Sequence, residues 1–153
     1  MKNYTAYLFD MDGTLVNSEP LKALALSETC GCFGKKVKPG IYKDVMGESW
    51  TNVTNHFFTH AQIKPNIDDF NTEFRKIYEE LIRKELKPNP NVKKLIEKLV
   101  AKNKKIGLVS SASIWMVKQI LIQLQMSEIF DIVISHEDVN NHKPDPEAYI
   151  LAL

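Results

Sequence analysis

Two aspartates one residue apart, Asp10 and Asp12 in the stretch FDMDGT, are the first residues whose types and spacing could support chemistry. Two carboxylates this close repel each other unless a cation or a reacting group lies between them. One carboxylate could attack phosphorus while its neighbour moves the required proton. Gly13 would allow a sharp turn whose N–H groups point at phosphoryl oxygens. The alternative is a simple turn, because Asp and Gly both favour turns.

Two serines and a lysine later in the chain add further candidates. Ser110 and Ser111 directly follow the apolar run KIGLV, and Lys143 stands in the stretch HKPDP, beyond the apolar run IVI. A hydroxyl can donate to a phosphoryl oxygen, and a lysine can offset the charge of a transferring phosphoryl group. Mg²⁺, bound through one or two carboxylates and phosphate oxygens, would supply a second cation. The alternatives are serines that begin and cap a helix, and a solvated lysine.

Short apolar runs rich in β-forming residues precede these candidates. They predict buried strands over residues 5–9, 105–111 and 130–135. Helical patterns lie between and after the later strands, so we expect a parallel sheet with crossover helices. The first of these helices is predicted to bury one apolar face, formed by Val92, Leu95, Ile96, Leu99 and Val100. Because the carboxyl ends of parallel strands share one edge of the sheet, the candidates should converge there.

A block of helical patterns interrupts this arrangement directly after the first strand. We predict helices with Ser18 and Ser49 as N-caps, a short helix around residues 40–46, and a long helix near 67–86. The long helix should carry one apolar stripe, made of Phe70, Phe74, Ile77, Tyr78 and Leu81. The predicted organisation is an α/β core of residues 1–16 and 87–153, with an all-helical insert over residues 17–86.

Composition excludes several classes of partner. The chain has 20 Lys and Arg against 19 Asp and Glu, so its charge favours neither nucleic acid nor an anionic membrane. No apolar run approaches the roughly 20 residues of a membrane span. The two cysteines, Cys30 and Cys32, are separated by one residue, and a disulfide between them would be strained. We therefore expect reduced thiols and a cytoplasmic protein.

Three motifs in this order resemble a known family. DMDGT after an apolar strand, then GLVSS, then HKPDP are similar to the first three motifs of the haloacid dehalogenase superfamily. The stretch DMDGTLVNSEP is similar to the branch that holds phosphoglycolate phosphatases, sugar phosphatases and β-phosphoglucomutase. The resemblance implies a Rossmann-like core with an inserted helical cap. It also implies a Mg²⁺-dependent phosphatase that acts on a small phosphate monoester through an aspartyl phosphate.

The resemblance also implies roles for individual residues. Asp10 would be the nucleophile, Asp12 the general acid and base, Ser110 a phosphate-binding residue and Lys143 the charge-neutralising amine. Mg²⁺ would be held by the Asp10 side chain and the main-chain carbonyl of Asp12. The presence of an acid at position 12 favours phosphoryl chemistry, because the true dehalogenases of the superfamily lack it.

The helical insert would contribute residues that read the substrate. Lys22 stands early in the first insert helix, and the stretch VMGESW has the position of the family's cap loop. Gly47 in this loop would allow close approach, while Glu48 could contact the substrate. The alternative is a turn that joins two helices, followed by a packed Trp50.

Departures from the family pattern leave alternatives open. The family's fourth motif is absent, so we expect a core truncated at its C-terminal side, with residues 5–9 as an exposed edge along which the chain could dimerise. A phosphomutase is disfavoured by Lys22, which stands where the mutase has a histidine. A phosphonoacetaldehyde hydrolase would need a cap lysine that forms a Schiff base. The remaining alternative is a non-catalytic fragment or interaction module.

Overall fold

The computed structural model describes residues 4–153, and the chain divides into two compact units. The first, here the α/β unit, ends at Asn17 and resumes at Leu86, and the second, the helical unit, is Ser18–Glu85. Both boundaries lie one residue from those that the sequence predicts.

The α/β unit is built on a three-stranded parallel sheet, so the predicted sheet is confirmed. Its strands are β1 (Ala6–Phe9), β2 (Lys105–Val109) and β3 (Ile132–Ile134), in the order β1-β2-β3. The central strand β2 is buried from its second residue on, as its continuous apolar run predicts. β1 lies at one edge of the sheet, with β2 as its neighbour.

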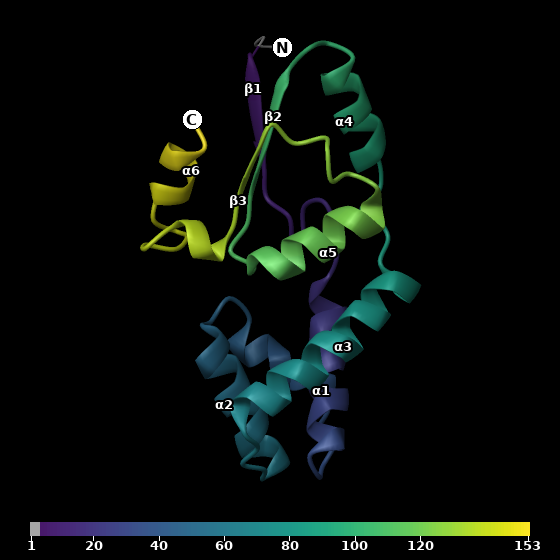
Figure 1. The fold of residues 1–153 in the computed structure, drawn as a ribbon, viewed down its shortest axis with the longest axis vertical. Helices are drawn as coiled ribbons and strands as arrows, with labels where there is room; N and C mark the ends of the chain where they lie inside the picture. The colour runs from purple at the N-terminus through teal and green to yellow at the C-terminus, as the bar shows by residue number, and fades with distance from the viewer. Residues whose placement is uncertain (1–3) are drawn as a thin grey trace. The chain divides into compact units, whose positions relative to one another are not determined.

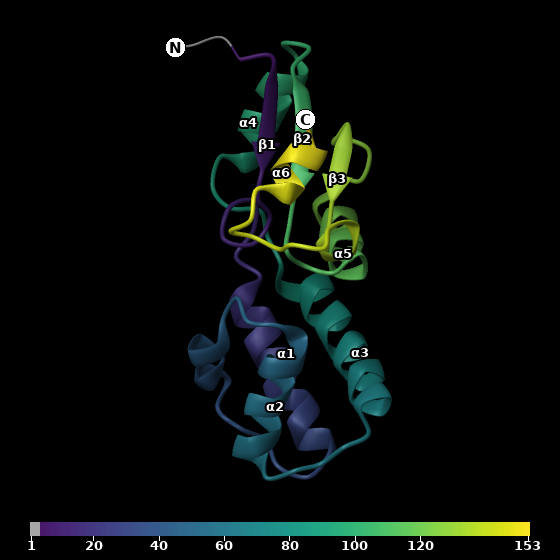
Figure 2. The ribbon, with the colours of Figure 1, turned by 90° about the vertical axis from the view of Figure 1, so that its left-hand side faces the viewer.

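Helices cover the two faces of this sheet. α4 (Val92–Val100) and α5 (Ile114–Leu124) lie on one side and α6 (Glu147–Leu151) on the other (Figures 1 and 2). On the α6 side, Ala148 packs with Val109 and Ile134, and Leu8 and Ile132 pack against this cluster. The apolar residues of α6 thus hold the helix, and the loop before it, on the sheet.

The apolar face of α4 is narrower than its sequence predicts. Ile96 and Leu99 are buried, whereas Leu95 is 47% and Val100 50% exposed, so the prediction was wrong for these two. A short helix packed on a sheet buries only the residues along the line of contact, and Leu95 and Val100 flank that line.

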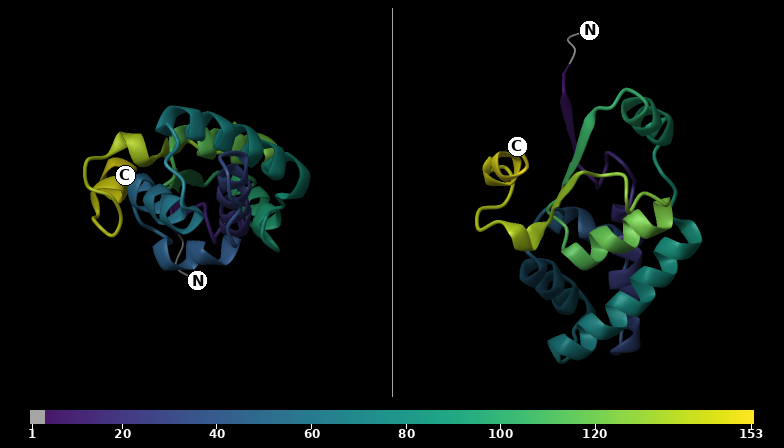
Figure 3. Two further views of the ribbon diagram at one scale, coloured as in Figure 1. Left: turned by 90° about the horizontal axis from the view of Figure 1, so that it is seen from below. Right: turned by 45° about the horizontal axis from the view of Figure 1, so that its top comes forward.

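The helical unit holds α1 (Glu19–Cys32), α2 (Trp50–Ala61), α3 (Ile67–Glu85) and the 3-10 helix η1 (Pro39–Val45). Its described residues contain no strand, as predicted. α3 packs against α1, and the two helices cross in the right-hand view of Figure 3. Within residues 4–153, no helix combines the length and the apolar character that crossing a bilayer requires.

The capping and stripe predictions for this unit are confirmed in part. Ser49 Oγ accepts a hydrogen bond from the Asn52 N–H at 3.2 Å and caps α2, while Ser18 stands at the N-cap of α1 without a side-chain capping bond. The buried stripe of α3 consists of Phe70, Phe74, Tyr78 and Ile82. Ile77 and Leu81, which were predicted in this stripe, are half-buried because they lie beside the i, i+4 line that faces α1.

Candidate active site

The ends of the three strands bring Asp10 and Lys143 into direct contact. Asp10 follows β1, and Lys143 comes from the loop after β3. Lys143 Nζ donates to Asp10 Oδ1 at 2.5 Å and to the carbonyl of Val109, the last residue of β2, at 2.7 Å. The side chains of Lys143 and Asp10 are 21% and 39% exposed, so the pair is open to solvent and to a ligand. The predicted convergence at the carboxyl edge of the sheet is therefore present for these two residues.

In the turn after Asp10, the N–H groups of residues 13–16 donate hydrogen bonds to carbonyls of the turn itself. Gly13 has a φ of +79°, in the left-handed region that glycine favours. Its N–H donates to the Val16 carbonyl at 2.7 Å, and the Leu15 N–H donates to the Met11 carbonyl at 2.9 Å. The Gly13 amide is thus bonded within the turn, and the role of this turn in binding a phosphoryl group stays a prediction. Gly13 has open space where a Cβ would lie, and half-buried Asp12 pairs with Val16 in the same turn.

Asn89, where the chain returns to the α/β unit, holds this turn from outside. Its N–H donates to the Leu15 carbonyl at 2.8 Å, and its Nδ2 donates to the Thr14 carbonyl at 3.0 Å. Val16 and Pro88 form an antiparallel bridge beside it. The outgoing and returning segments of the chain are thus tied together within this unit, which the sequence did not predict.

Ser110 and Ser111 follow β2 but differ in exposure. Ser110 is 3% exposed; its N–H donates to the Ile134 carbonyl at 2.9 Å, and its Oγ accepts from the Ala112 N–H at 3.1 Å. Ser111 is exposed. Neither caps the following helix, since α5 has Ser113 at its N-cap. The capping alternative for these two serines is therefore wrong.

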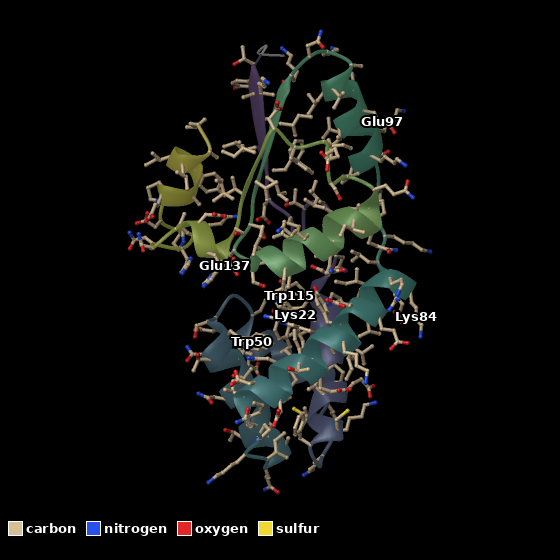
Figure 4. All side chains as sticks on the ribbon, in the orientation of Figure 1. Lys22, Trp50, Lys84, Glu97, Trp115 and Glu137 are labelled. Carbon is tan, nitrogen blue, oxygen red and sulfur yellow. The ribbon has the colours of Figure 1, made fainter. Side chains whose placement is uncertain are left out.

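Carboxylates shape the loop that carries Lys143. Asp138 accepts from both the N–H and the Oγ of Ser135, and these bonds hold its pKa below the ordinary range. Glu137 of the 3-10 helix η2 (His136–Asp138) accepts from the Ile114 N–H at 2.8 Å and so binds the start of α5 (Figure 4). The sequence shows these acids as a charged loop, but only the loop's conformation reveals that they bind backbone amides.

The predicted substrate-reading residues all lie in the helical unit. Lys22 on α1 is half-buried, with its Nζ 5.9 Å from the centroid of the Tyr42 ring in η1. Gly47 has a φ of +86° and open space around it, and exposed Glu48 accepts from Asn52 Nδ2 at 3.1 Å. Lys22 thus lies beside η1, and Gly47 and Glu48 lie in the loop between η1 and α2.

Trp50 packs inside the same unit. Its ring lies 4.8 Å from that of Phe74, and its Nε1 donates to Asn71 Oδ1 at 2.9 Å. The labelled side chains in Figure 4 show Lys22 on α1 and Trp50 at the start of α2. The expected packing of Trp50 is therefore observed, and the substrate-reading roles of Gly47 and Glu48 stay predictions.

The donor set at the strand ends suits a hard divalent cation. Among residues 4–153, no cluster of three or more His, Cys, Asp or Glu side chains could hold a metal ion. Mg²⁺ does not need such a cage, because it binds through one or two carboxylates, water and substrate phosphate oxygens. The Asp10 carboxylate and the main-chain carbonyl of Asp12 supply oxygen donors of that kind, so these residues fit magnesium better than a metal that needs nitrogen or sulfur ligands.

Residues 7–153 match the family model described as haloacid dehalogenase-like hydrolase. The chain belongs to this family. The predicted membership, and with it the prediction of a hydrolase of this superfamily, are confirmed. The Rossmann-like core with an inserted helical domain is that of the family, so the predicted fold class is also confirmed.

Several curated relatives that the chain matches are named phosphatases. It is 30% identical over 152 residues to a phosphorylated carbohydrates phosphatase of Thermotoga maritima, covering 97% of this chain and 68% of that protein. It is also 30% identical to a phosphoglycolate phosphatase of Aquifex aeolicus, covering 95% and 67%. The crystal structure of CbbY from Rhodobacter sphaeroides in complex with phosphate has the same fold, with a TM-score of 0.84, 24% identity and coverage of 99% and 72%. The chain thus spans about two thirds of the length of these relatives.

Proposed function

We propose that this chain is a Mg²⁺-dependent phosphatase that acts on a small phosphate monoester, of the sugar phosphate or phosphoglycolate type. The contact of Lys143 with both Asp10 and the end of β2 carries the proposal, because it sets a cation beside a carboxylate at the carboxyl edge of the sheet. The names of the two relatives that are 30% identical support the substrate class.

In the proposed reaction, the two aspartates divide the work. A carboxylate oxygen of Asp10 attacks phosphorus, the bond to the leaving oxygen breaks, and Asp12 gives that oxygen a proton. Asp12 then removes a proton from water, which attacks the phosphorus of the aspartyl phosphate and regenerates the Asp10 carboxylate. Inorganic phosphate and an alcohol are the products, and no atom changes its oxidation state.

Cations and donors around Asp10 make this attack possible. Lys143 offsets the repulsion between the carboxylate and the incoming phosphate, and the Ser110 hydroxyl donates to a phosphoryl oxygen. Asp10 and Asp12 would hold Mg²⁺, which withdraws negative charge from the phosphoryl group when bound. Exposed Ser111 could add a further donor.

We assign the two units different parts in this reaction. The α/β unit would bind and transfer the phosphoryl group, and the helical unit would act as a cap that selects the leaving group. Lys22, Gly47 and Glu48 would carry that selection. The partner is a small phosphorylated molecule, and we expect neither nucleic acid nor membrane as a ligand.

A turnover assay tests the proposal. With Mg²⁺ present, the chain should release inorganic phosphate from phosphoglycolate, from a sugar phosphate or from a generic aryl phosphate. Asp10→Asn should abolish release because an amide is a poor nucleophile. Asp69→Asn, the same change at an exposed position of α3, is the matched control and should retain full activity. Full turnover by Asp10→Asn would overturn the proposed mechanism, and transfer to a second sugar instead of water would indicate a mutase.

A further inference from the structure

The loop between β3 and α6 carries Lys143, and its two ends are joined by a single side chain. In Figure 2 this loop runs from the end of β3 to the start of α6. Glu147, the first residue of α6, is four residues beyond Lys143. It was absent from the set of residues that the sequence singled out.

Both carboxylate oxygens of Glu147 are occupied by donors of this loop. Oε1 accepts from the Asn140 N–H at 2.9 Å, and Oε2 accepts from the Asn141 N–H at 2.9 Å and from Asn141 Nδ2 at 2.8 Å. Hydrogen bonds to an ionised carboxylate are stronger than those between neutral groups. Consistent with this, the same bonds hold the pKa of Glu147 below its ordinary range.

These bonds close residues 140–147 into a hydrogen-bonded ring, and Lys143 is one of the residues of this ring. The ring is braced further by Asp145, whose Oδ1 accepts from the Glu147 N–H at 2.9 Å and whose N–H donates to the His142 carbonyl at 3.0 Å. α6 anchors the ring to the sheet through Ala148. Lys143 therefore leaves a backbone that is fixed on both sides, and its amine reaches Asp10 and the Val109 carbonyl.

We propose that Glu147 is a positioning residue that holds the Lys143 amine against Asp10. The expected effect on kcat rests on the proposed function, whereas the expected effect on the position of the Lys143 amine does not. Glu147 does not act on the substrate itself, because both of its oxygens bind N–H groups of the loop. A long, flexible lysine side chain gains precision only when its backbone is fixed, and a small misplacement of a catalytic group costs much of its effect.

The first test compares Glu147→Gln with Glu97→Gln, an exposed position on α4 labelled in Figure 4. The glutamine amide presents a donor where Glu147 has an acceptor, so one part of the ring is lost. Glu147→Gln should lower kcat by about 10-fold to 10²-fold with little change in KM. Glu97→Gln should change neither. Asn141→Ala, which removes only one of the three bonds, should show a smaller loss in the same direction, and unchanged kcat in both loop variants would overturn the proposal.

A double-variant comparison distinguishes positioning from general stabilisation. If Glu147 acts through Lys143, adding Glu147→Gln to Lys143→Met should cause no further loss of kcat. Fully additive losses would show that Glu147 contributes by another route and would overturn the proposal.

A readout that does not depend on activity separates this inference from the proposed function. Limited acylation with acetic anhydride, followed by peptide mass spectrometry, measures how accessible the Lys143 amine is. Relative to exposed Lys118 on α5, Lys143 should react several-fold faster in Glu147→Gln than in the parent chain, and equally in Glu97→Gln. An unchanged Lys143 rate would overturn the positioning role even in an active enzyme, whereas an inactive parent chain with a faster Lys143 rate in Glu147→Gln would refute only the phosphatase.

Discussion

Asp10 and Asp12 stand one residue apart, and the structure shows how the chain tolerates two acids at this spacing. Lys143 binds Asp10 directly, and Asp12 pairs with Val16 in the turn that follows. A cation beside one carboxylate lowers the repulsion between the two. Asp10 therefore lies beside a cation and is partly exposed, so a substrate can reach it.

Asp12→Asn should slow turnover without unfolding the chain. Asp12 is half-buried beside Asp10, and asparagine keeps its shape while removing its capacity to give and take a proton. We expect kcat to fall by about 10²-fold to 10⁴-fold, the usual share of general acid–base catalysis. The loss should be smaller for an aryl phosphate, whose leaving group needs little protonation. Comparing the two substrates in steady-state kinetics measures this, and equal losses on both would argue against an acid role.

The placement of Asp10, Ser110 and Lys143 after the strand ends could be predicted from the sequence because each follows a recognisable strand. The contacts of Gly13 and Glu147 could not. Gly13 was predicted to allow a turn whose N–H groups point at a phosphate, and the structure adds that its own amide donates to Val16. Glu147 looked like one of several loop acids. Both outcomes depend on which backbone groups a turn brings within 3 Å, and residue types alone do not specify this.

At the scale of the elements, Gly107 on β2 leaves room for neighbouring side chains on the face of the sheet that α6 covers. A Cβ at this position would lie 2.6 Å from Leu8 Cδ2 and 2.9 Å from Ile132 Cγ2. These side chains come from the strands on either side and pack on the α6 face. Gly107→Ala should therefore lower the free energy of unfolding by about 1–3 kcal/mol through overpacking.

Gly40→Ala is the control for this prediction, since nothing lies within 4 Å of a Cβ there. It should leave stability nearly unchanged or slightly raised. Urea unfolding followed by circular dichroism measures both variants, and equal stability of Gly107→Ala and the parent chain would refute the close packing.

The loop between β3 and α6 should lose its stabilisation in acid. Hydrogen bonds from loop donors hold the pKa values of Asp138 and Glu147 below their ordinary ranges. A carboxyl group with a depressed pKa in the folded state contributes stability that is fully present above its unfolded pKa and is lost as pH falls through the folded value. The free energy of unfolding should thus be level near neutral pH and fall in acid below the ordinary range of Asp and Glu. Glu147→Gln should flatten part of that fall, and an identical pH profile in urea titrations would contradict this account.

Element types were easier to predict than element faces. The alternation of apolar runs and helical patterns gave three parallel strands and the helices between them, and all are present. Leu95 and Val100 of α4 were misplaced because amphipathic spacing marks residues that can be buried, while the neighbouring element decides how many are.

For the whole molecule, the edge position of β1 has a consequence. Within residues 4–153, β1 pairs with β2 alone, and Tyr7, Leu8 and Phe9 are half-buried. An uncovered edge strand with apolar side chains can pair with another chain. We expect two copies of this chain to associate along β1, as a dimer whose mass appears in light scattering at high concentration. Ala6→Lys should weaken this dimer, and a parent chain that stays monomeric at high concentration would contradict the expectation.

The central claim, that Asp10 of the α/β unit attacks phosphorus, is tested most directly by trapping the covalent intermediate. The chain is mixed with Mg²⁺ and an aryl phosphate, quenched with borohydride, and digested for mass spectrometry. An acyl phosphate at Asp10 is reduced to the alcohol, so the peptide containing FDMDGT should carry homoserine at position 10. Substrate turnover with Asp10 unmodified, or with the reduction at Asp12, would contradict the account.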